Sequence, residues 1–216
     1  MKLEELNKEY DKLQKIYGDN NLDSIYNGGY SDNPDIAFVF MNPTGRNIAS
    51  SKTWKGLKSP WIGTKNIWDL FNELDLIDKT IYNQIKSKKG KEWTEEFAED
   101  VYNSIKEHKY FITNLAKCTQ VDARPLPDSV YKKYLKLFEK EISIVNPKVI
   151  ILFGNQVSSI VLDKNISVSK CRRKRFEKEI NGNIYKFYSV FYPVGNGRFN
   201  IDKSIEDIKW IINNEI

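Results

Sequence analysis

Residues 36–45 read IAFVFMNPTG, a run of five apolar residues followed by Met, an Asn-Pro pair and a turn. The apolar run, from Ile36 to Phe40, predicts a strand buried on both faces, as in the parallel sheets of α/β proteins. Pro43 ends this strand because it has no N–H to donate, and it keeps Asn42 away from helical backbone angles. Ligands bind at the carboxyl edge of such sheets, where Asn42 would stand. By itself, however, the stretch is more typical of a plain strand that ends in a turn.

Outward from this strand, apolar strands alternate with helical patterns. Further strands are predicted at 110–115, at 148–154 and, around the hairpin signal Asn181-Gly182, at 176–180 and 184–191. Helices are predicted at 3–17, 64–77 with Thr64 as N-cap, 94–107, 128–145, a short stretch after Asn155, and 203–214. Loops are expected at 27–29 and 42–63, and a solvated, mobile turn at 86–91.

This alternation predicts an α/β fold. We expect a three-layer sandwich whose central, mostly parallel four-stranded sheet is flanked by helices, plus a possible antiparallel edge hairpin. The 216 residues suit a single domain, 1–216, with an N-terminal helical extension at about 1–30.

Composition limits the class of protein. The 34 Lys and Arg exceed the 29 Asp and Glu by 5, an excess that is compatible with a polyanionic partner without requiring one. Cys118, Cys171 and the single His108 are too few for a zinc or iron–sulfur site, so we expect no metal and no cofactor. No stretch has the length of a membrane span and the start resembles no signal peptide. A reduced, cytoplasmic monomer is the resulting expectation.

The loops that follow the predicted parallel strands should meet at one edge of the sheet. They would bring together Asn42, Asn114, Asn155 and Asn196. Because this edge has no His and few carboxylates, a hydrolase built on a catalytic triad or a metal ion is hard to assemble there.

Four segments, in order, resemble the motifs of the uracil-DNA glycosylase superfamily. MNPTG at 41–45 resembles the first motif, which reads GEAPG, GMNPG or GLNPG in branches of that family, and SPWIG at 59–63 resembles the PFVG segment. TNLAKC at 113–118 is similar to TNVVKC, and YPVGNGR at 192–198 stands where the family has its HPSP-like second motif. The resemblance spans about residues 34–200, and the ordered set is more specific than any one motif.

Two departures from the family pattern stand out. Phe40 replaces the glycine that opens the first motif, and Tyr192 replaces the second-motif histidine that stabilises the departing uracil anion. The iron–sulfur branch of the family needs four cysteines, whereas this chain has two. The resemblance therefore implies a divergent member without a cluster.

The resemblance also implies roles for individual residues. Asn42 would orient the attacking water and Tyr192 would donate its hydroxyl to the base, as the catalytic pair. Met41, Trp61 and Asn114 would bind the base, with Trp61 stacking on it and Asn114 matching the uracil edge. The structural alternatives are an Asx turn at Asn42, a buried bridging Asn114, a core Trp61 and a packed aromatic at Tyr192, the last of these slightly favoured.

Two further groups are assigned to DNA contacts. The first is formed by turns near the two motifs: Thr44, Gly45, Gly195, Asn196 and Arg198. The second is the basic run, residues 170–175, with Arg172, Arg173 and Arg175 placed to meet phosphates. A plain surface loop and a solvated strand edge are the respective alternatives.

The leading hypothesis is a DNA base-excision glycosylase that flips uracil or a related damaged base and hydrolyses its N-glycosidic bond by water attack. The alternative is a non-catalytic nucleotide or nucleic-acid-binding protein on the same fold. A general nucleotide-binding domain fits less well because the chain lacks a glycine-rich phosphate loop of the usual spacing.

Overall fold

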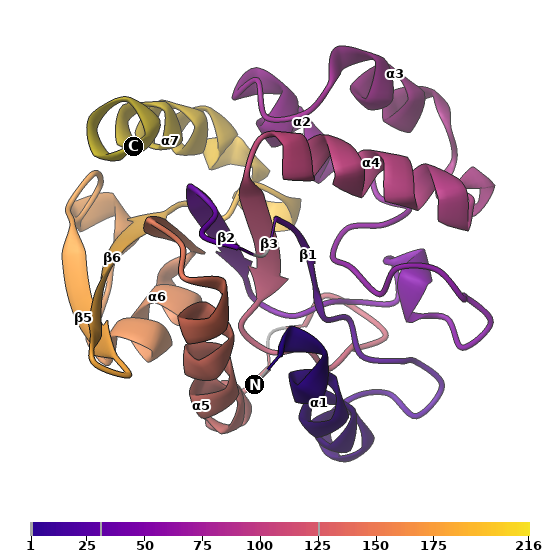
Figure 1. Ribbon diagram of the computed structural model, residues 1–216, viewed down its shortest axis with the longest axis horizontal. Coiled ribbons are helices and arrows are strands. Elements are labelled where there is room, and N and C mark those ends of the chain that lie inside the picture. The colour runs from indigo at the N-terminus through magenta and orange to yellow at the C-terminus, as the bar shows by residue number, and fades with distance from the viewer. Residues whose placement is uncertain (1, 31, 125) are drawn as a thin grey trace.

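The computed structural model describes residues 2–30, 32–124 and 126–216. Their strands form one six-stranded sheet in the order β1-β3-β2-β4-β6-β5 (Figure 1). The four central strands run parallel: β3 (Tyr110–Asn114), β2 (Ile36–Phe40), β4 (Val149–Phe153) and β6 (Asn183–Val190). Helices flank both faces. The predicted three-layer α/β sandwich with its four-stranded parallel centre is confirmed.

Both edges of the sheet are antiparallel. β5 (Phe176–Ile180) pairs with β6 through the predicted hairpin, in which Asn181 and Gly182 have φ of 50° and 84°. The other edge, β1 (Asn27–Gly29), pairs with β3 where a loop was expected. The expectation was wrong because β1 has no apolar side chain to signal a strand. Its backbone lies close to α4 instead, and a Cβ on Gly28 would lie 2.1 Å from the Tyr102 ring.

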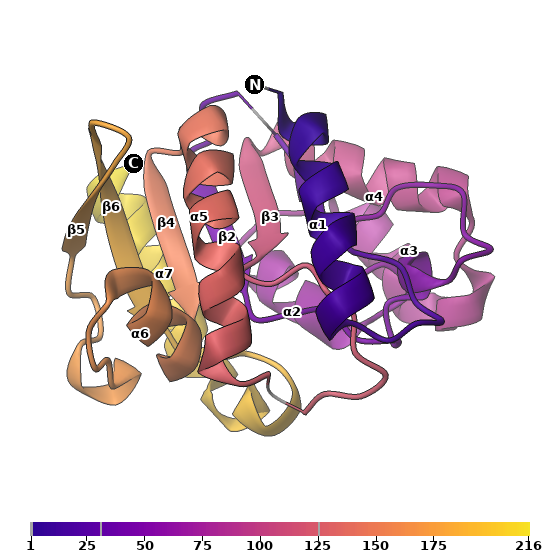
Figure 2. The ribbon, with the colours of Figure 1, turned by 90° about the horizontal axis from the view of Figure 1, so that it is seen from below.

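Helices cover both faces of the sheet (Figure 2), and successive side chains of β2 point alternately to one face and the other. Ile36, Phe38 and Phe40 point into a core shared with helices α2, α4 and α7, whereas Ala37 and Val39 point into a core shared with helices α1, α5 and α6. The first set of helices, with α3, spans Asn66–Glu73 (α2), Lys79–Ser87 (α3), Glu95–Glu107 (α4) and Ile201–Glu215 (α7). The second set spans Leu3–Tyr17 (α1), Asp128–Val145 (α5) and Asn155–Leu162 (α6).

The N-terminal segment forms part of the layer on the second face. Leu6 and Tyr10 of α1 are buried in the core there, beside α5. Gln14 connects α1 to the following loop by donating to the carbonyl oxygens of Asp19 and Leu22 at 2.9 Å each. Among the described residues, no helix combines the length and apolar character needed to cross a membrane.

The region after the first long loop differs from the predicted helix at 64–77. α2 begins later, with Lys65 as N-cap, because the Thr64 hydroxyl donates to the Trp61 carbonyl at 2.7 Å instead of capping. It ends at Glu73, and Asp78 starts α3 by accepting from the N–H groups of Thr80 and Ile81. The apolar period continues across this break, which is why the sequence did not indicate it. The expected mobile turn at 86–91 instead contains the end of α3 and a short 3₁₀ turn, Gly90–Glu92.

Candidate active site

A cavity of about 620 Å³ lies beyond the carboxyl ends of β2 and β3. Four residues singled out in the sequence line it together, and we call them the cavity residues: Asn42, Trp61, Asn114 and Tyr192. They come from segments that are up to 150 residues apart in the chain. Parallel strands with their carboxyl ends at one edge bring them together.

Asn42 follows β2, and both ends of its side-chain amide have a partner. Its Nδ2 donates to the Pro43 carbonyl at 3.1 Å, and its Oδ1 accepts from the hydroxyl of Tyr131 at 2.6 Å. An Asx turn would need Oδ1 to accept from the N–H of Thr44, and among the described residues its donor is the hydroxyl of Tyr131 instead. The N–H of Gly45 is likewise engaged elsewhere, donating to the Gln120 carbonyl at 2.8 Å. One lone pair of Oδ1 remains for a further donor.

Tyr131 is the residue at this site that sequence reasoning missed. It lies in α5, is fully buried, and belongs to the apolar face of that helix. In the sequence it is therefore a core position like Tyr134, and nothing in the helical period indicates that its hydroxyl reaches the end of β2. Burial, with a further contribution from nearby Tyr192, raises the pKa of Tyr131 above its usual value. The hydroxyl is therefore a stable donor at neutral pH.

Asn114, the last residue of β3, differs from Asn42. Its side chain is only 2% exposed and its Nδ2 has no hydrogen-bond partner among the described residues. A buried amide without a partner costs free energy in the folded protein unless a ligand supplies one. Because Asn114 lines the cavity, a ligand there can supply it.

A buried ion pair supports the backbone next to Asn114. Lys117 and Glu141, both fully buried, lie 2.8 Å apart, and Lys117 also donates to the Asn114 carbonyl at 2.6 Å. Glu141 accepts further hydrogen bonds from Thr113 Oγ1 at 2.9 Å and Asn27 Nδ2 at 2.8 Å. Burial lowers the pKa of Lys117, and the charge of Glu141 opposes that shift. The network ties β1, β3 and α5 together where the predicted base-binding residue leaves its strand.

Aromatic rings form one side of the cavity. The Trp61 ring meets Phe40 edge to face, with centroids 5.0 Å apart, and Tyr192 meets Phe40 likewise at 6.2 Å. Phe40 itself stacks on Phe153 at 4.3 Å. Phe40, the departure from the family glycine, is thus a fully buried support for the two rings that line the cavity. Trp61 has φ of 69°, a left-handed conformation that is rare for a bulky residue.

Tyr192 follows β6 and is partly buried. Burial raises the pKa of its phenol, and its hydroxyl makes no hydrogen bond with the described residues. The turn behind it needs glycine, because a Cβ on Gly197 would lie 2.0 Å from the Tyr192 carbonyl oxygen. Tyr192 can therefore donate a hydrogen bond to a ligand but cannot supply the positive charge of a protonated histidine.

Of the residues assigned to DNA contacts in the turns near the two motifs, only some line this cavity. Thr44 and Gly195 line it, whereas Gly45 and Asn196 are exposed and outside its lining. Arg198 is 59% exposed in its side chain and lies 3.8 Å from Asp69 of α2. Two residues that the sequence analysis did not select also stand out: Arg46 lines the cavity, and Phe199, next to Arg198 in the 3₁₀ turn Gly195–Asn200, is 94% exposed. An exposed Phe carries no signal in the sequence.

Met41 lies elsewhere. Its side chain packs against the core formed with α1, α5 and α6, and it does not line the cavity. The side chains of consecutive residues at the end of β2 point to opposite faces, so Met41 faces away when Phe40 faces the cavity. The side chain of Met41 is therefore not positioned to bind a base.

The basic run is engaged in ion pairs. Arg172 and Arg173 both bind the fully buried carboxylate of Asp207 in α7, at 2.8 and 2.9 Å. Arg175 pairs with Glu177 at 3.2 Å and with Glu215 at 3.7 Å. Acidic partners already neutralise these three arginines, so the structure favours the strand-edge alternative over a dedicated phosphate-binding site.

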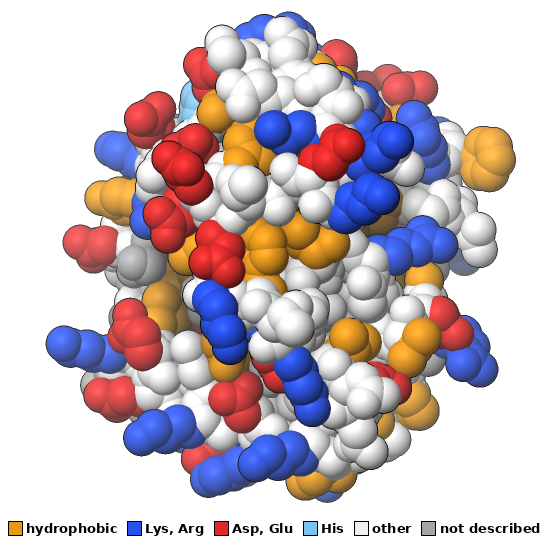
Figure 3. Space-filling view, turned by 90° about the vertical axis from the view of Figure 1, so that its right-hand side faces the viewer, with side chains coloured by type: hydrophobic (Ala, Val, Ile, Leu, Met, Phe, Trp, Pro, Cys, Tyr) orange, Lys and Arg blue, Asp and Glu red, His pale blue; other side chains and the backbone are white. Residues whose placement is uncertain are grey.

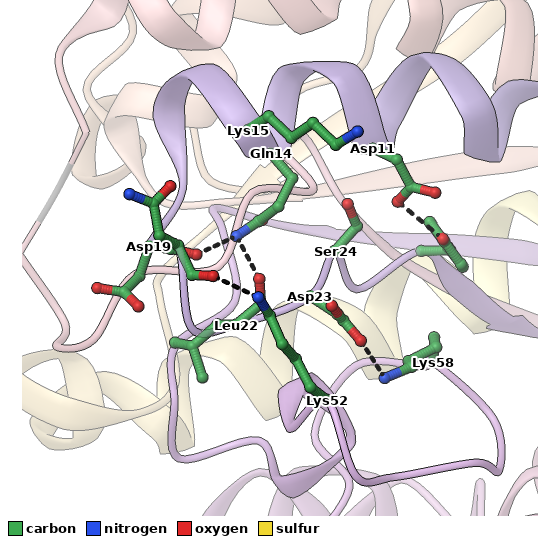
Figure 4. A pocket seen from close by; sticks show the side chains of 11 residues that line it. Asp11, Gln14, Lys15, Asp19, Leu22, Asp23, Ser24, Lys52 and Lys58 are labelled. Atoms are coloured by element: carbon green, nitrogen blue, oxygen red, sulfur yellow. Dashed lines mark hydrogen bonds and ion pairs between the residues drawn. The ribbon is translucent and has the colours of Figure 1, made fainter.

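Elsewhere the described residues form smaller hollows, of about 360 and 300 Å³. Lys and Arg side chains alternate with Asp and Glu on the face seen in Figure 3. A second hollow, of about 360 Å³, lies between α1 and the loop that follows it (Figure 4). Its polar groups largely satisfy one another, as in the Lys58–Asp23 pair at 2.9 Å. Within the described ranges, no group of three or more His, Cys, Asp and Glu side chains could hold a metal ion.

Comparison with known proteins agrees with this geometry. A family model described as Uracil DNA glycosylase superfamily matches residues 28–203, a stretch that contains β2 to β6, all of β1 except Asn27, and all four cavity residues. No curated protein matches the chain. The family match supports a glycosylase-like function on DNA in general and an enzyme of the hydrolase class. Because the match covers well over half of its length, the chain belongs to the uracil-DNA glycosylase superfamily.

Proposed function

We propose that the protein is a DNA base-excision glycosylase that hydrolyses the N-glycosidic bond of uracil or a related damaged base. The observation that carries this proposal is the shared cavity of Asn42, Trp61, Asn114 and Tyr192. It combines an acceptor for water, an aromatic face, two buried donors without a partner among the described residues (Asn114 Nδ2 and Trp61 Nε1) and the hydroxyl of Tyr192. A nucleotide flipped out of the duplex would need each of these groups.

The chemistry would proceed by water attack. The bond between the sugar C1′ and the base nitrogen breaks, and its electron pair leaves with the base, so that positive charge develops on the sugar. A water molecule that donates to Asn42 Oδ1 forms the new C1′–O bond and releases its proton to solvent or to the departing base. Asn42 orients this water but is too weak a base to accept the proton. The catalytic contribution is therefore positioning, together with donors for the anionic base.

Base choice would depend on Asn114. Its unpartnered Nδ2 can donate to a carbonyl oxygen of uracil, and its Oδ1 can accept from the neighbouring ring N–H. Cytosine has the opposite polarity at its amino end and would leave donor facing donor, which favours its rejection. Trp61 offers a ring face for stacking, and Tyr192 a hydroxyl for the base oxygen that gathers charge.

DNA would lie across the cavity rim. Thr44, Gly45, Gly195, Asn196 and Arg198 are the rim residues that we propose to contact it. Arg46 and Lys65 also line the cavity and are better suited to phosphates than Arg172, Arg173 and Arg175, which have acidic partners. We further propose a cytoplasmic monomer that acts without a metal or cofactor.

One observation favours a second function, a non-catalytic nucleotide or nucleic-acid-binding protein on the same fold. Tyr192 lines the cavity where the family has histidine, and a phenol cannot carry the positive charge of an imidazolium, so it stabilises an anionic base less. A cavity with this residue could bind a flipped base without cleaving the bond.

The deciding experiment is incubation of the protein with uracil-containing single- and double-stranded oligonucleotides, followed by alkali to break abasic sites. Cleavage at uracil by the wild type, lost in Asn42→Ala, supports the enzyme. No cleavage by the wild type but gain of cleavage in Tyr192→His supports the binding protein. Wild-type cleavage that survives Asn42→Ala at full rate would contradict the assignment of the site.

A further inference from the structure

The hydrogen bond between Tyr131 and Asn42 joins two parts of the molecule that the sequence does not relate. Tyr131 stands near the start of α5, on the far face of the sheet from Trp61 and Tyr192. Its hydroxyl nevertheless reaches the end of β2 and donates to Asn42 Oδ1 at 2.6 Å. The contact is between side chains 89 residues apart.

The position of the Tyr131 hydroxyl is determined by packing. The ring is fully buried in the same core as Tyr134 and Phe138 of α5. The start of the helix is held by Gln156 of α6, whose Nε2 donates to Asp128 Oδ1 at 2.7 Å and to the Leu126 carbonyl at 3.0 Å. A buried ring on a helix held in this way has little freedom to move its hydroxyl.

The orientation of the Asn42 amide follows from its two neighbours together. Pro43 offers a carbonyl oxygen, which can only accept, so the NH₂ end of Asn42 must face it. A flipped amide would set oxygen against oxygen there. Tyr131 then meets the remaining oxygen as a donor, and because burial raises its pKa it keeps its proton at neutral pH. Oδ1 of Asn42 keeps one free lone pair, which can accept a hydrogen bond from a water in one direction only.

We infer that Tyr131 is a positioning residue for the glycosylase reaction: it holds the Asn42 carboxamide so that Oδ1 orients the attacking water. The inference rests on the proposed function. Tyr131 does not touch the reacting atoms, and its effect passes through Asn42. Without the Tyr131 hydroxyl, the Asn42 amide can rotate, and a water bound to its Oδ1 is less often in position to attack C1′. Loss of the hydroxyl should therefore lower kcat and leave substrate binding unchanged.

The test compares Tyr131→Phe with Tyr134→Phe. Both variants remove one hydroxyl from a fully buried tyrosine of α5, but the hydroxyl of Tyr134 lies beside Cys118 and makes no hydrogen bond with the cavity residues. We expect Tyr131→Phe to lower kcat about tenfold with KM unchanged, the usual scale for one lost hydrogen bond in a transition state. Tyr134→Phe should match the wild type. Similar melting temperatures of the two variants would exclude a general loss of structure as the cause.

A double-variant cycle tests whether the effect passes through Asn42. The combination of Asn42→Ala with Tyr131→Phe should be no slower than Asn42→Ala alone, because the hydroxyl then has nothing to position. If the fall in kcat of the double variant equals the product of the two single-variant falls, the inference is overturned. An unchanged kcat in Tyr131→Phe would also overturn it. Either result would leave the proposed function intact.

A second readout is independent of turnover. In ¹⁵N-labelled protein, the side-chain amide signal of Asn42 is identified by its loss in Asn42→Ala. It should shift in Tyr131→Phe and stay in place in Tyr134→Phe. A signal that does not move in Tyr131→Phe overturns the inference. If the wild type cleaves no tested substrate, the proposed function fails and the catalytic role of Tyr131 fails with it, even where the shift upholds the contact.

Discussion

The cavity and the basic run both stand out in the sequence as polar segments next to strands, yet the fold treats them in opposite ways. At the cavity, the buried donors Asn114 Nδ2 and Trp61 Nε1 have no partner among the described residues. At the basic run, Arg172 and Arg173 share the buried carboxylate of Asp207. Groups left without partners in a hollow are available to a ligand, whereas paired charges stabilise the protein itself. Binding capacity therefore depends on what the fold leaves unsatisfied.

The largest expected effect is that of Asn42→Ala. The variant removes the acceptor that orients the water, so kcat for uracil excision should fall by about a hundredfold or more. Affinity for uracil-containing DNA should stay, because the group acts in the transition state. Single-turnover rates and a gel-shift titration on the same oligonucleotide measure the two quantities. A drop in affinity that accounts for the whole loss would mean that Asn42 binds substrate instead.

The next effect tests the other side of the comparison. Asp207→Asn removes a buried negative charge that pairs with two arginines. We expect the free energy of unfolding to fall by about 2 kcal/mol, a value kept low because solvent screens the exposed parts of Arg172 and Arg173. Urea denaturation measures it. Excision by the folded variant should equal that of the wild type. A catalytic defect without a stability loss would place the basic run in the site after all.

Asn114→Asp should change the choice of base. A carboxylate keeps the acceptors but loses the amide donor that has no protein partner, so uracil excision should fall about tenfold or more. Competition between uracil and other modified pyrimidines in otherwise identical oligonucleotides gives the ratio. Equal falls for every base would indicate a structural role for Asn114 in place of base reading.

The smallest effect is on salt dependence. Arg46 lines the cavity and has no ion pair among those found in the described residues, whereas Arg173 is paired. If Arg46 meets a phosphate, Arg46→Ala should reduce the slope of log affinity against log salt by about one, and Arg173→Ala should leave it unchanged. Fluorescence anisotropy across a salt series provides both slopes. If only Arg173→Ala reduced the slope, the basic run and not the cavity lining would be the region that meets phosphates.

Local patterns were sufficient for most of the architecture. The apolar runs predicted the central strands, and Asn181-Gly182 predicted the hairpin, because both signals depend on neighbouring residues alone. The helix predicted at 94–107 is α4, where Thr94 accepts from the Phe97 N–H at 3.1 Å. Local patterns failed where the decisive contact was distant: β1 forms by pairing with β3, and the helix at 64–77 divides in two at a cap that its apolar period does not indicate.

The sequence by itself determined the α/β class, the order of the strands along the chain, and the ordered motifs that gather Asn42, Trp61, Asn114 and Tyr192 at one edge. The class and the strand order follow from local periodicity, and the expectation that Asn42 and Asn114 share one edge follows from the rule that parallel strands end on one side. The places of Trp61 and Tyr192 were implied by the resemblance of their motifs to the family. Only the tertiary structure decided which polar groups have partners. Tyr131 reaches Asn42 across 89 positions, Asp207 pairs with two arginines, and Asn114 Nδ2 has no partner among the described residues. Hydrogen bonds form between groups that packing brings within about 3 Å, wherever they stand in the chain.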